Sequence, residues 1–288
     1  VMMSESLDGG EVTYRSSRHF DILNENIVFD LKHWDSNLPK ATDTYAYRTL
    51  FENRRNAYGQ GLVLLNSTSH DERNLADPWE AVIFSAALGM IDGATMIFPG
   101  QELGLSYDWG YTHFETGFEG KSIPHFKRWN SMMPLWSDTN FGHDQLFPVY
   151  KGIQQARRSS PALSSPNRYF LDGDGFNSKI FATAKYEEEG ALSTGKDVVI
   201  GFANLDRWNT QSENFKIPSS LASLIGLDDD RLYNIVNIAA YERAPTIINR
   251  RNSLLWDAPK SGLELKNTGF YVLLNKVPTI DSDWDTVP

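Results

Sequence analysis

Short apolar runs alternate with helix-like stretches through the first 160 residues of the chain. The strand-like runs lie at 1–3, 20–23, 61–65 and 94–98. The unbroken apolar run at 61–65 is typical of a strand covered on both faces, as in a parallel sheet. The intervening stretches predicted to be helical are 26–34, 44–58 and 78–90. This alternation predicts strand–helix units and therefore a parallel sheet or barrel.

The third of these helices has a clear start signal. Asp77 is placed to be the N-cap, and Pro78 follows as the first helical residue. The apolar residues expected on one face are Trp79, Val82, Ile83, Ala86, Ala87 and Met90. We therefore predict an amphipathic helix with a single buried face.

The pattern changes after a further predicted helix at 144–160. Short apolar or alternating runs, separated by turn-rich stretches, lie at 180–184, 198–202, 232–236 and 270–274. Such runs predict an all-β region, which we expect to be an antiparallel β-sandwich. The sequence thus predicts two domains, an α/β domain at 1–162 and an all-β domain at 163–288.

Composition narrows the classes of partner. The chain has 27 Lys and Arg against 37 Asp and Glu, a net charge of −10, and no stretch forms a basic groove. We therefore expect no nucleic-acid partner. No apolar run approaches about 18 residues, so we expect no membrane span. The absence of cysteine excludes disulfides and thiolate metal sites. Eight Trp and twelve Tyr suit either a core or a sugar-binding cleft.

Two apolar runs end in side chains that could carry chemistry. His70 and Asp71 follow the run at 61–65, and Glu5 lies at the carboxyl end of the strand predicted at the start of the chain. Ligands bind beyond the carboxyl ends of parallel strands, so these positions are where chemistry is expected. The alternatives are that Asp71 caps the next helix, that His70 is a surface histidine and that Glu5 is a solvated loop acid.

The segment 105–143 has little periodicity and holds several aromatic residues: Tyr107, Trp109, Trp129 and Trp136. A segment this long without regular structure is usually functional or disordered, and its aromatic content favours a binding loop. We expect some of these rings to stack on sugars. The alternative is that all four are packed in the core.

The ordered set of Glu5 in SESLDGG, His70-Asp71 in STSHDE and GQELG at 100–104 resembles the second half of the alpha-amylase family, glycoside hydrolase family 13. The resemblance implies a fold made of the second half of a TIM (β/α)8 barrel, strands five to eight, followed by a C-terminal β-domain. It implies a retaining glycoside hydrolase that acts on α-glucosidic bonds of starch-type or oligosaccharide substrates. Hydrolase, transferase and isomerase activities are not separable from this half.

The same resemblance assigns roles to residues. Glu5 matches the general acid/base, with Asp8 and Glu11 as the other candidates. Asp71 matches the carboxylate that stabilises the transition state, and His70 matches a histidine that binds the same sugar. The residue before His70 is Ser69, where the family commonly has asparagine.

The family's nucleophilic aspartate follows the fourth strand, which would precede Val1. We therefore expect the chain to be a part that lacks the nucleophile-bearing half. No cofactor is expected in the chain, although the complete enzyme could bind calcium through loops of the missing half.

The predicted partners are an α-glucan or oligosaccharide and the missing barrel half. That half could be a separate chain or a second copy, because strands at 1–4 and 94–98 would otherwise be unpaired edges. The alternative function is a catalytically silent, amylase-like carbohydrate-binding or scaffold protein. Retention of an acid, a histidine and a stabilising carboxylate in the family order favours the enzyme.

Overall fold

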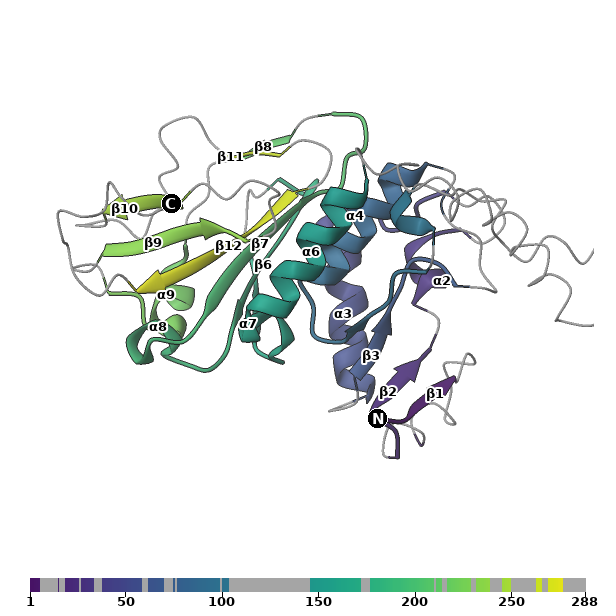
Figure 1. Cartoon of the computed structure of the whole chain (residues 1–288), viewed down its shortest axis with the longest axis horizontal. Helices are drawn as coiled ribbons and strands as arrows, with labels where there is room; N and C mark the ends of the chain where they lie inside the picture. Colours follow the sequence, from purple (N-terminus) through teal and green to yellow (C-terminus); the bar gives the residue numbers. More distant parts are fainter. Residues whose placement is uncertain are drawn as a thin grey trace, which may run out of the picture.

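A computed structural model of the chain describes residues 1–5, 15, 19–25, 27–33, 38–58, 62–69, 75, 77–98, 100–103, 146–171, 177–209, 211–213, 217–228, 232–238, 245–249, 263–265 and 269–276. A parallel sheet with its helices occupies one end of the molecule, and an antiparallel sheet occupies the other (Figure 1). None of the described helices is long and apolar enough to cross a bilayer.

Four strands form the parallel sheet. They are β1 (Met3–Glu5), β2 (Ile22–Asn24), β3 (Leu62–Leu65) and β4 (Ala94–Thr95), and they lie side by side in chain order. All three pairings are parallel. The pairing of β4 extends one residue further, since Met96 N donates to Leu65 O at 3.0 Å. The strands are shorter than the apolar runs that predicted them, but the parallel sheet itself is confirmed.

The helices of this layer follow the predicted order. They are α2 (Val28–Leu31), α3 (Thr44–Tyr58), α4 (Pro78–Gly89), the 3-10 helix η1 (Gln101–Leu103), α6 (Phe147–Ser159) and α7 (Pro161–Ser164). Asp77 caps α4 as predicted, because its Oδ1 accepts a hydrogen bond from Trp79 N at 2.8 Å. The predicted helix at 26–34 is correct in type but is only the four residues of α2.

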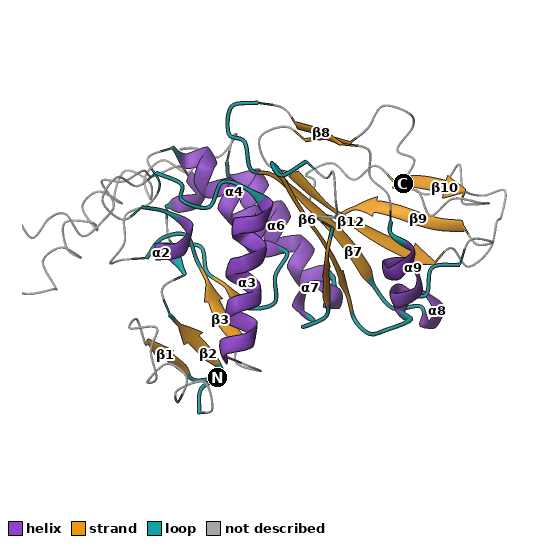
Figure 2. Ribbon diagram, turned by 180° about the vertical axis from the view of Figure 1, so that it is seen from behind, coloured by secondary structure: helices purple, strands orange, loops and turns teal. Residues whose placement is uncertain are grey.

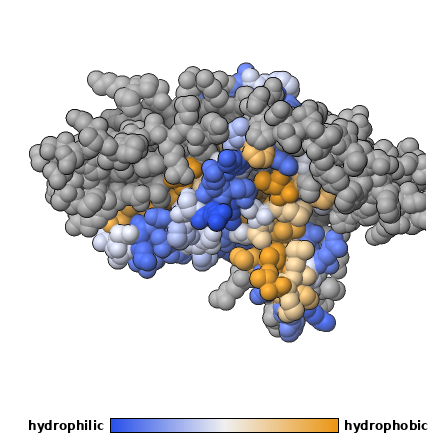
Figure 3. Space-filling view, viewed as in Figure 1, coloured by the Kyte–Doolittle hydropathy of each residue, from blue (hydrophilic) through white to orange (hydrophobic). Residues whose placement is uncertain are grey.

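The two faces of the parallel sheet have different surroundings. Leu23 and Val63 are paired across β2 and β3, and they pack with Ala57 of α3. The preceding cross-strand row is Met3, Ile22 and Leu62. Side chains alternate between the faces of a strand, so this row points away from α3. Met3 is 55% exposed and Leu62 is 41% exposed. Hydrophobic residues gather over these strands in Figure 3.

Helix α4 is buried more completely than its sequence predicts. Its buried residues are Ala81, Val82, Ile83, Phe84, Ala86, Ala87, Leu88 and Gly89. The helix contacts α6 and also β7 of the antiparallel sheet, so segments distant in sequence cover the face that an amphipathic helix would expose. The prediction of one buried face was therefore too narrow, and α4 is a central helix of the core.

Six strands form the antiparallel sheet. Their order is β10 (Pro245–Asn249), β9 (Leu232–Asn237), β12 (Gly269–Lys276), β7 (Val198–Asn204), β6 (Ile180–Tyr186) and β5 (Arg168–Phe170). The remaining elements are a pair of strands, β8 (Gln211–Glu213) and β11 (Leu263–Leu265), and two short helices, α8 (Ala191–Thr194) and α9 (Ser219–Ile225) (Figure 2). All four predicted strands are confirmed, as is the antiparallel β-region. The finer arrangement as a sandwich stays a prediction.

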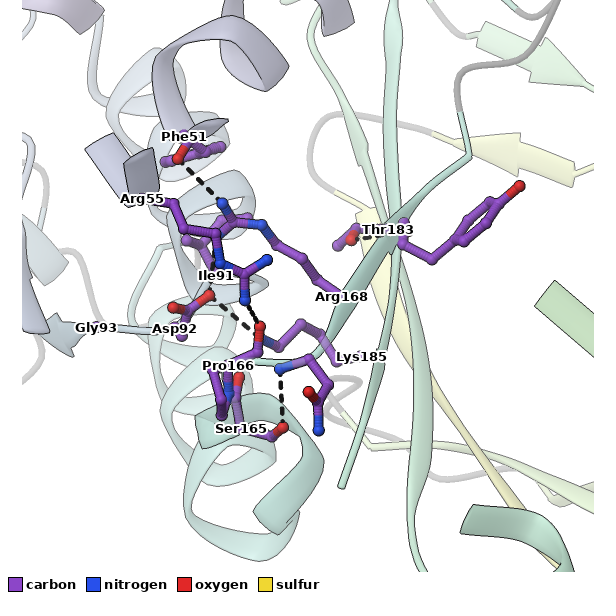
Figure 4. A network of polar contacts seen from close by, with 12 residues as sticks. Phe51, Arg55, Ile91, Asp92, Gly93, Ser165, Pro166, Arg168, Thr183 and Lys185 are labelled. Atoms are coloured by element: carbon purple, nitrogen blue, oxygen red, sulfur yellow. Dashed lines mark hydrogen bonds and ion pairs between the residues drawn. The ribbon is translucent and has the colours of Figure 1, made fainter. Parts of the chain in front are cut away.

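A buried ionic cluster joins the two layers (Figure 4). Asp92, between α4 and β4, accepts from Arg168 Nη1 at 2.8 Å and lies 3.4 Å from Lys185 Nζ. Burial opposes ionisation of Asp92, but Lys185 and Arg168 together hold its pKa below the usual value. Burial lowers the pKa of Lys185 to about 7, against the attraction of Asp92. The predicted domain boundary at 162/163 falls inside α7, beside this cluster, and stays a prediction.

Candidate active site

Glu5 is the last residue of β1, at the carboxyl edge of the parallel sheet. It is exposed, and it is paired with Asn24, the last residue of β2. Glu5 lies two residues after Met3, so both side chains point to the face that turns away from α3. This geometry leaves the Glu5 carboxylate accessible to a ligand that approaches the edge from that face.

A buried polar turn follows β3 at the same edge. Asn66, Ser67, Thr68 and Ser69 are all buried although each has a polar side chain. Asn66 Nδ2 donates to Thr68 O at 3.2 Å, while no partner is found for Asn66 Oδ1 within the described part of the chain. The turn is therefore held both by its own bond from Asn66 to Thr68 O and by a bond that Ser67 Oγ accepts from Gln101. Its last described residue is Ser69, which precedes His70 in the sequence.

Gln101 ties the end of β4 to the turn after β3. Its Nε2 lies within hydrogen-bond distance of three hydroxyl oxygens: Ser67 Oγ at 2.7 Å, Tyr150 Oη at 3.0 Å and Ser85 Oγ at 3.3 Å. Its Oε1 accepts from Phe98 N at 3.3 Å. Burial raises the pKa of Tyr150, so this phenol stays protonated. The buried amide thereby fixes two adjacent strand ends relative to α4 and α6.

The residues on either side of Gln101 form a compact turn. Gly100 has a φ of 92°, a conformation that favours glycine, and its N–H donates to Glu102 Oε2 at 2.9 Å. The GQE part of the motif that carries the family resemblance is therefore a positioning element. Its polar side chains hold the strand exits in place and are consistent with either an active or a silent site.

A charged cluster at the exit of β2 was missed from the sequence. Glu25 directly follows β2, is buried, and accepts a hydrogen bond from Arg54 Nε. Arg54 Nη2 also donates to Asp30 Oδ2 at 2.6 Å. The signal was present, because Arg54 lies on the same helical face as Tyr47 and Phe51, and an arginine at a core-facing position needs a buried acid. The cluster fixes the carboxyl end of β2 between Glu5 and the β3 turn.

The remaining predicted site residues lie outside the described residues: His70, Asp71, Tyr107, Trp109, Trp129 and Trp136. The strands that lead to Glu5 and Asp71 are not adjacent, because β2 lies between β1 and β3.

No metal site is found in the described ranges, where no three His, Asp or Glu side chains lie together. The site described by the structure is therefore an acidic and amide-rich strand edge. Such an edge can protonate a leaving group and hydrogen-bond to hydroxyl-rich ligands.

Comparisons with known proteins identify the fold. No protein-family model and no curated protein matches the sequence. Among solved structures, an Anoxybacillus alpha-amylase has a TM-score of 0.58 at 10% identity, with 96% of this chain and 53% of that chain covered. AmyP in complex with maltose has a TM-score of 0.63 at 13% identity, with 97% and 56% covered. The gamma-CGTase of alkalophilic Bacillus clarkii has a TM-score of 0.58 at 9% identity, with 95% and 36% covered.

The chain thus spans about half the length of these solved structures, or less. Nearly all of this chain is included in each match, so both the parallel and the antiparallel sheet belong to the shared fold. At these identities the likeness shows the fold and not the activity. The resemblance to alpha-amylases is confirmed in that sense: the chain has the fold of part of an alpha-amylase structure.

Proposed function

We propose that the chain is the second barrel half and the C-terminal β-domain of an alpha-amylase-like glycoside hydrolase. The substrate class is an α-glucan or an oligosaccharide with α-glucosidic bonds, cleaved by a retaining mechanism. The observation that supports this most strongly is the amylase fold over 95–97% of the chain together with an exposed acid at the carboxyl end of β1.

The strand order supports a barrel half over an open doubly wound sheet. Parallel strands in strict chain order, joined by right-handed crossovers, place all their helices on one face. An open doubly wound sheet instead reverses its order and is covered on both faces. The order β1-β2-β3-β4 has no reversal, and the row of Met3, Ile22 and Leu62 points away from α3. In a closed barrel this face would be the interior, filled by side chains of the other four strands.

The proposed chemistry divides between Glu5 and residues beyond the β3 turn. Glu5 protonates the glycosidic oxygen as the bond to the leaving sugar breaks, and later accepts a proton from the attacking water. Asp71 stabilises the oxocarbenium-like transition state, and His70 hydrogen-bonds the same sugar. The nucleophilic carboxylate that forms the glycosyl-enzyme bond comes from the other barrel half, because a retaining site needs two carboxylates about 5–5.5 Å apart.

The assignment of Glu5 is tested by Glu5→Gln in the complete protein, with hydrolysis of a maltooligosaccharide as the readout. We expect a loss of at least about 100-fold in rate, because the amide cannot donate the proton. Asp21→Asn is the matched control, since Asp21 is an exposed acid at the amino end of β2. Near-normal turnover of Glu5→Gln would move the acid to Asp8 or Glu11. A wild-type protein that binds the sugar without cleaving it would favour a carbohydrate-binding or scaffold role.

A further inference from the structure

A cavity of about 400 Å³ lies between the helical layer and the loop after β7. Its lining residues are Leu38, Pro39, Ala41, Thr42, Glu80, Ile83, Phe84, Lys179, Leu205, Asp206, Arg207 and Trp208. The cavity shares no lining residue with the carboxyl edge of the parallel sheet described above. Its volume is within the range of small-molecule sites, about 300–1,000 Å³.

An exposed tryptophan stands at this cavity. Trp208 is 77% exposed, although burial of an indole stabilises a fold strongly. Leu38, another lining residue, is 53% exposed. A cavity with two exposed apolar side chains among its lining residues presents a surface that a partly apolar ligand would cover.

The loop that carries Trp208 is held in place by its own hydrogen bonds. The Asp206 carboxylate accepts from Trp208 N at 3.0 Å, from Asn209 N at 3.1 Å and from Gln211 Nε2 at 2.9 Å. Asn204 Oδ1 accepts in turn from Asp206 N at 2.8 Å. The indole is thus presented by a loop that needs little ordering when a ligand binds, which favours affinity.

Polar groups with unused hydrogen-bonding capacity lie beside this ring. Arg207 Nε is bonded to Asp77 Oδ2 at 2.5 Å, and its Cζ lies over one face of the Trp208 ring, 4.7 Å from the centroid, so a sugar would stack on the opposite face. Within the described part of the chain, the two Nη groups of Arg207 and the carboxylate of Glu80 have no hydrogen-bond partner. Glu80 is partly buried, and burial raises its pKa, as does Asp77. Lys179 Nζ donates to Thr42 O at 2.9 Å.

The balance of charge indicates a neutral ligand. The lining contains two acids, Glu80 and Asp206, and two bases, Lys179 and Arg207. An anion would meet the Glu80 carboxylate, and a cation would meet the Arg207 guanidinium. A ligand that combines an apolar ring face with many hydroxyls matches the exposed indole, the carboxylate and the guanidinium at once.

We propose that this cavity is a second saccharide-binding site, in which a sugar ring stacks on Trp208 and its hydroxyls bond to Glu80 and Arg207. The site is separate from the candidate active site and anchors a neutral oligosaccharide without cleaving it. The choice of an α-glucan as the ligand rests on the proposed function, whereas the choice of a neutral saccharide rests on the cavity alone.

The test is titration of the complete protein with a maltooligosaccharide, with binding followed by calorimetry. Glu5→Gln is the background, so that cleavage does not consume the ligand. Trp208→Ala should weaken one class of site by about tenfold or more, because the buried ring face is lost. Glu80→Gln should weaken it several-fold. Tyr45→Ala is the matched control, since Tyr45 is 53% exposed but does not line the cavity, and it should leave the affinity unchanged.

A hydrolysis assay separates this proposal from the proposed function. Trp208→Ala in the otherwise wild-type protein should keep its rate on a short soluble substrate and lose adsorption to insoluble starch. Unchanged adsorption and unchanged titration in Trp208→Ala would overturn the second site, whatever the result for Glu5. If the wild-type protein does not cleave the sugar but still binds it through Trp208, the proposed function is wrong and the second site is supported.

Discussion

Removing the charge of Asp92 should lower the free energy of unfolding more than a substitution of an exposed residue does. In Asp92→Asn the side-chain shape is kept, but Arg168 and Lys185 lose their shared carboxylate. Their side chains are only 3% and 1% exposed, so Arg168 would remain a buried cation without an anion, and Lys185 would keep its proton even less readily than it does beside Asp92. Breaking a buried ion pair by removing one partner costs about 3–5 kcal/mol.

The structure places the expected loss at the lower end of that range. Asp92 is itself 20% exposed, and both cations keep a backbone partner. Arg168 Nη2 donates to Phe51 O at 3.0 Å, and Lys185 Nζ donates to Ser165 O. We therefore expect Asp92→Asn to lower the free energy of unfolding by about 3 kcal/mol, equivalent to a urea midpoint lower by about 1 M or more.

Urea unfolding followed by both fluorescence and circular dichroism measures this change. Glu52→Gln is the matched control, because it breaks an exposed ion pair to Arg48 and should cost no more than about 0.5 kcal/mol. The double variant Asp92→Asn, Lys185→Met should be more stable than Asp92→Asn, since the buried amine that has lost its carboxylate is replaced by an apolar side chain. A loss below about 1 kcal/mol in Asp92→Asn would refute the view that the cluster stabilises the junction.

Three further predictions concern Lys185, Gln101 and the row of Met3, Ile22 and Leu62. First, the pKa of Lys185 is about 7 in the folded chain and ordinarily 10.5, so the unfolded state binds the extra proton between these values. The free energy of unfolding should therefore rise with pH from about 7 to 10, and Lys185→Met should flatten that rise in urea titrations; equal slopes would contradict it. Second, Gln101→Ala should cost about 2 kcal/mol in thermal or urea unfolding, because the two buried hydroxyls of Ser67 and Tyr150 and the Phe98 N–H lose a partner; unchanged stability would show that the Gln101 contacts are dispensable. Third, the 288-residue chain alone should self-associate in sedimentation through the exposed row of Met3, Ile22 and Leu62, and a well-behaved monomer would count against the half-barrel.

Local signals in the sequence predicted the elements well. Helix α3 has the predicted bounds, and the cap by Asp77 is as expected, because both depend on neighbouring residues only. Strands β6 and β7 were also predicted correctly, since an apolar run of this length needs no knowledge of its partners.

Features that depend on distant segments were not predictable. The extensive burial of α4 requires β7, which begins more than a hundred residues later in the chain. The pairing of Glu25 with Arg54 and the cluster around Asp92 depend on which helix faces which strand. For the site, the sequence predicted a strand-end acid at Glu5. It did not predict the hydrogen bonds of Gln101, because they join residues that are far apart in the sequence, as does the pairing of Glu25 with Arg54.

The most direct test of the proposed function is a proton NMR time course of maltooligosaccharide cleavage by the complete protein and by its Glu5→Gln variant. A retaining enzyme with Glu5 as its acid should release the α-anomer first, and the variant should release product at least about 100-fold more slowly. Initial release of the β-anomer, or an unchanged rate in Glu5→Gln, would contradict the proposal.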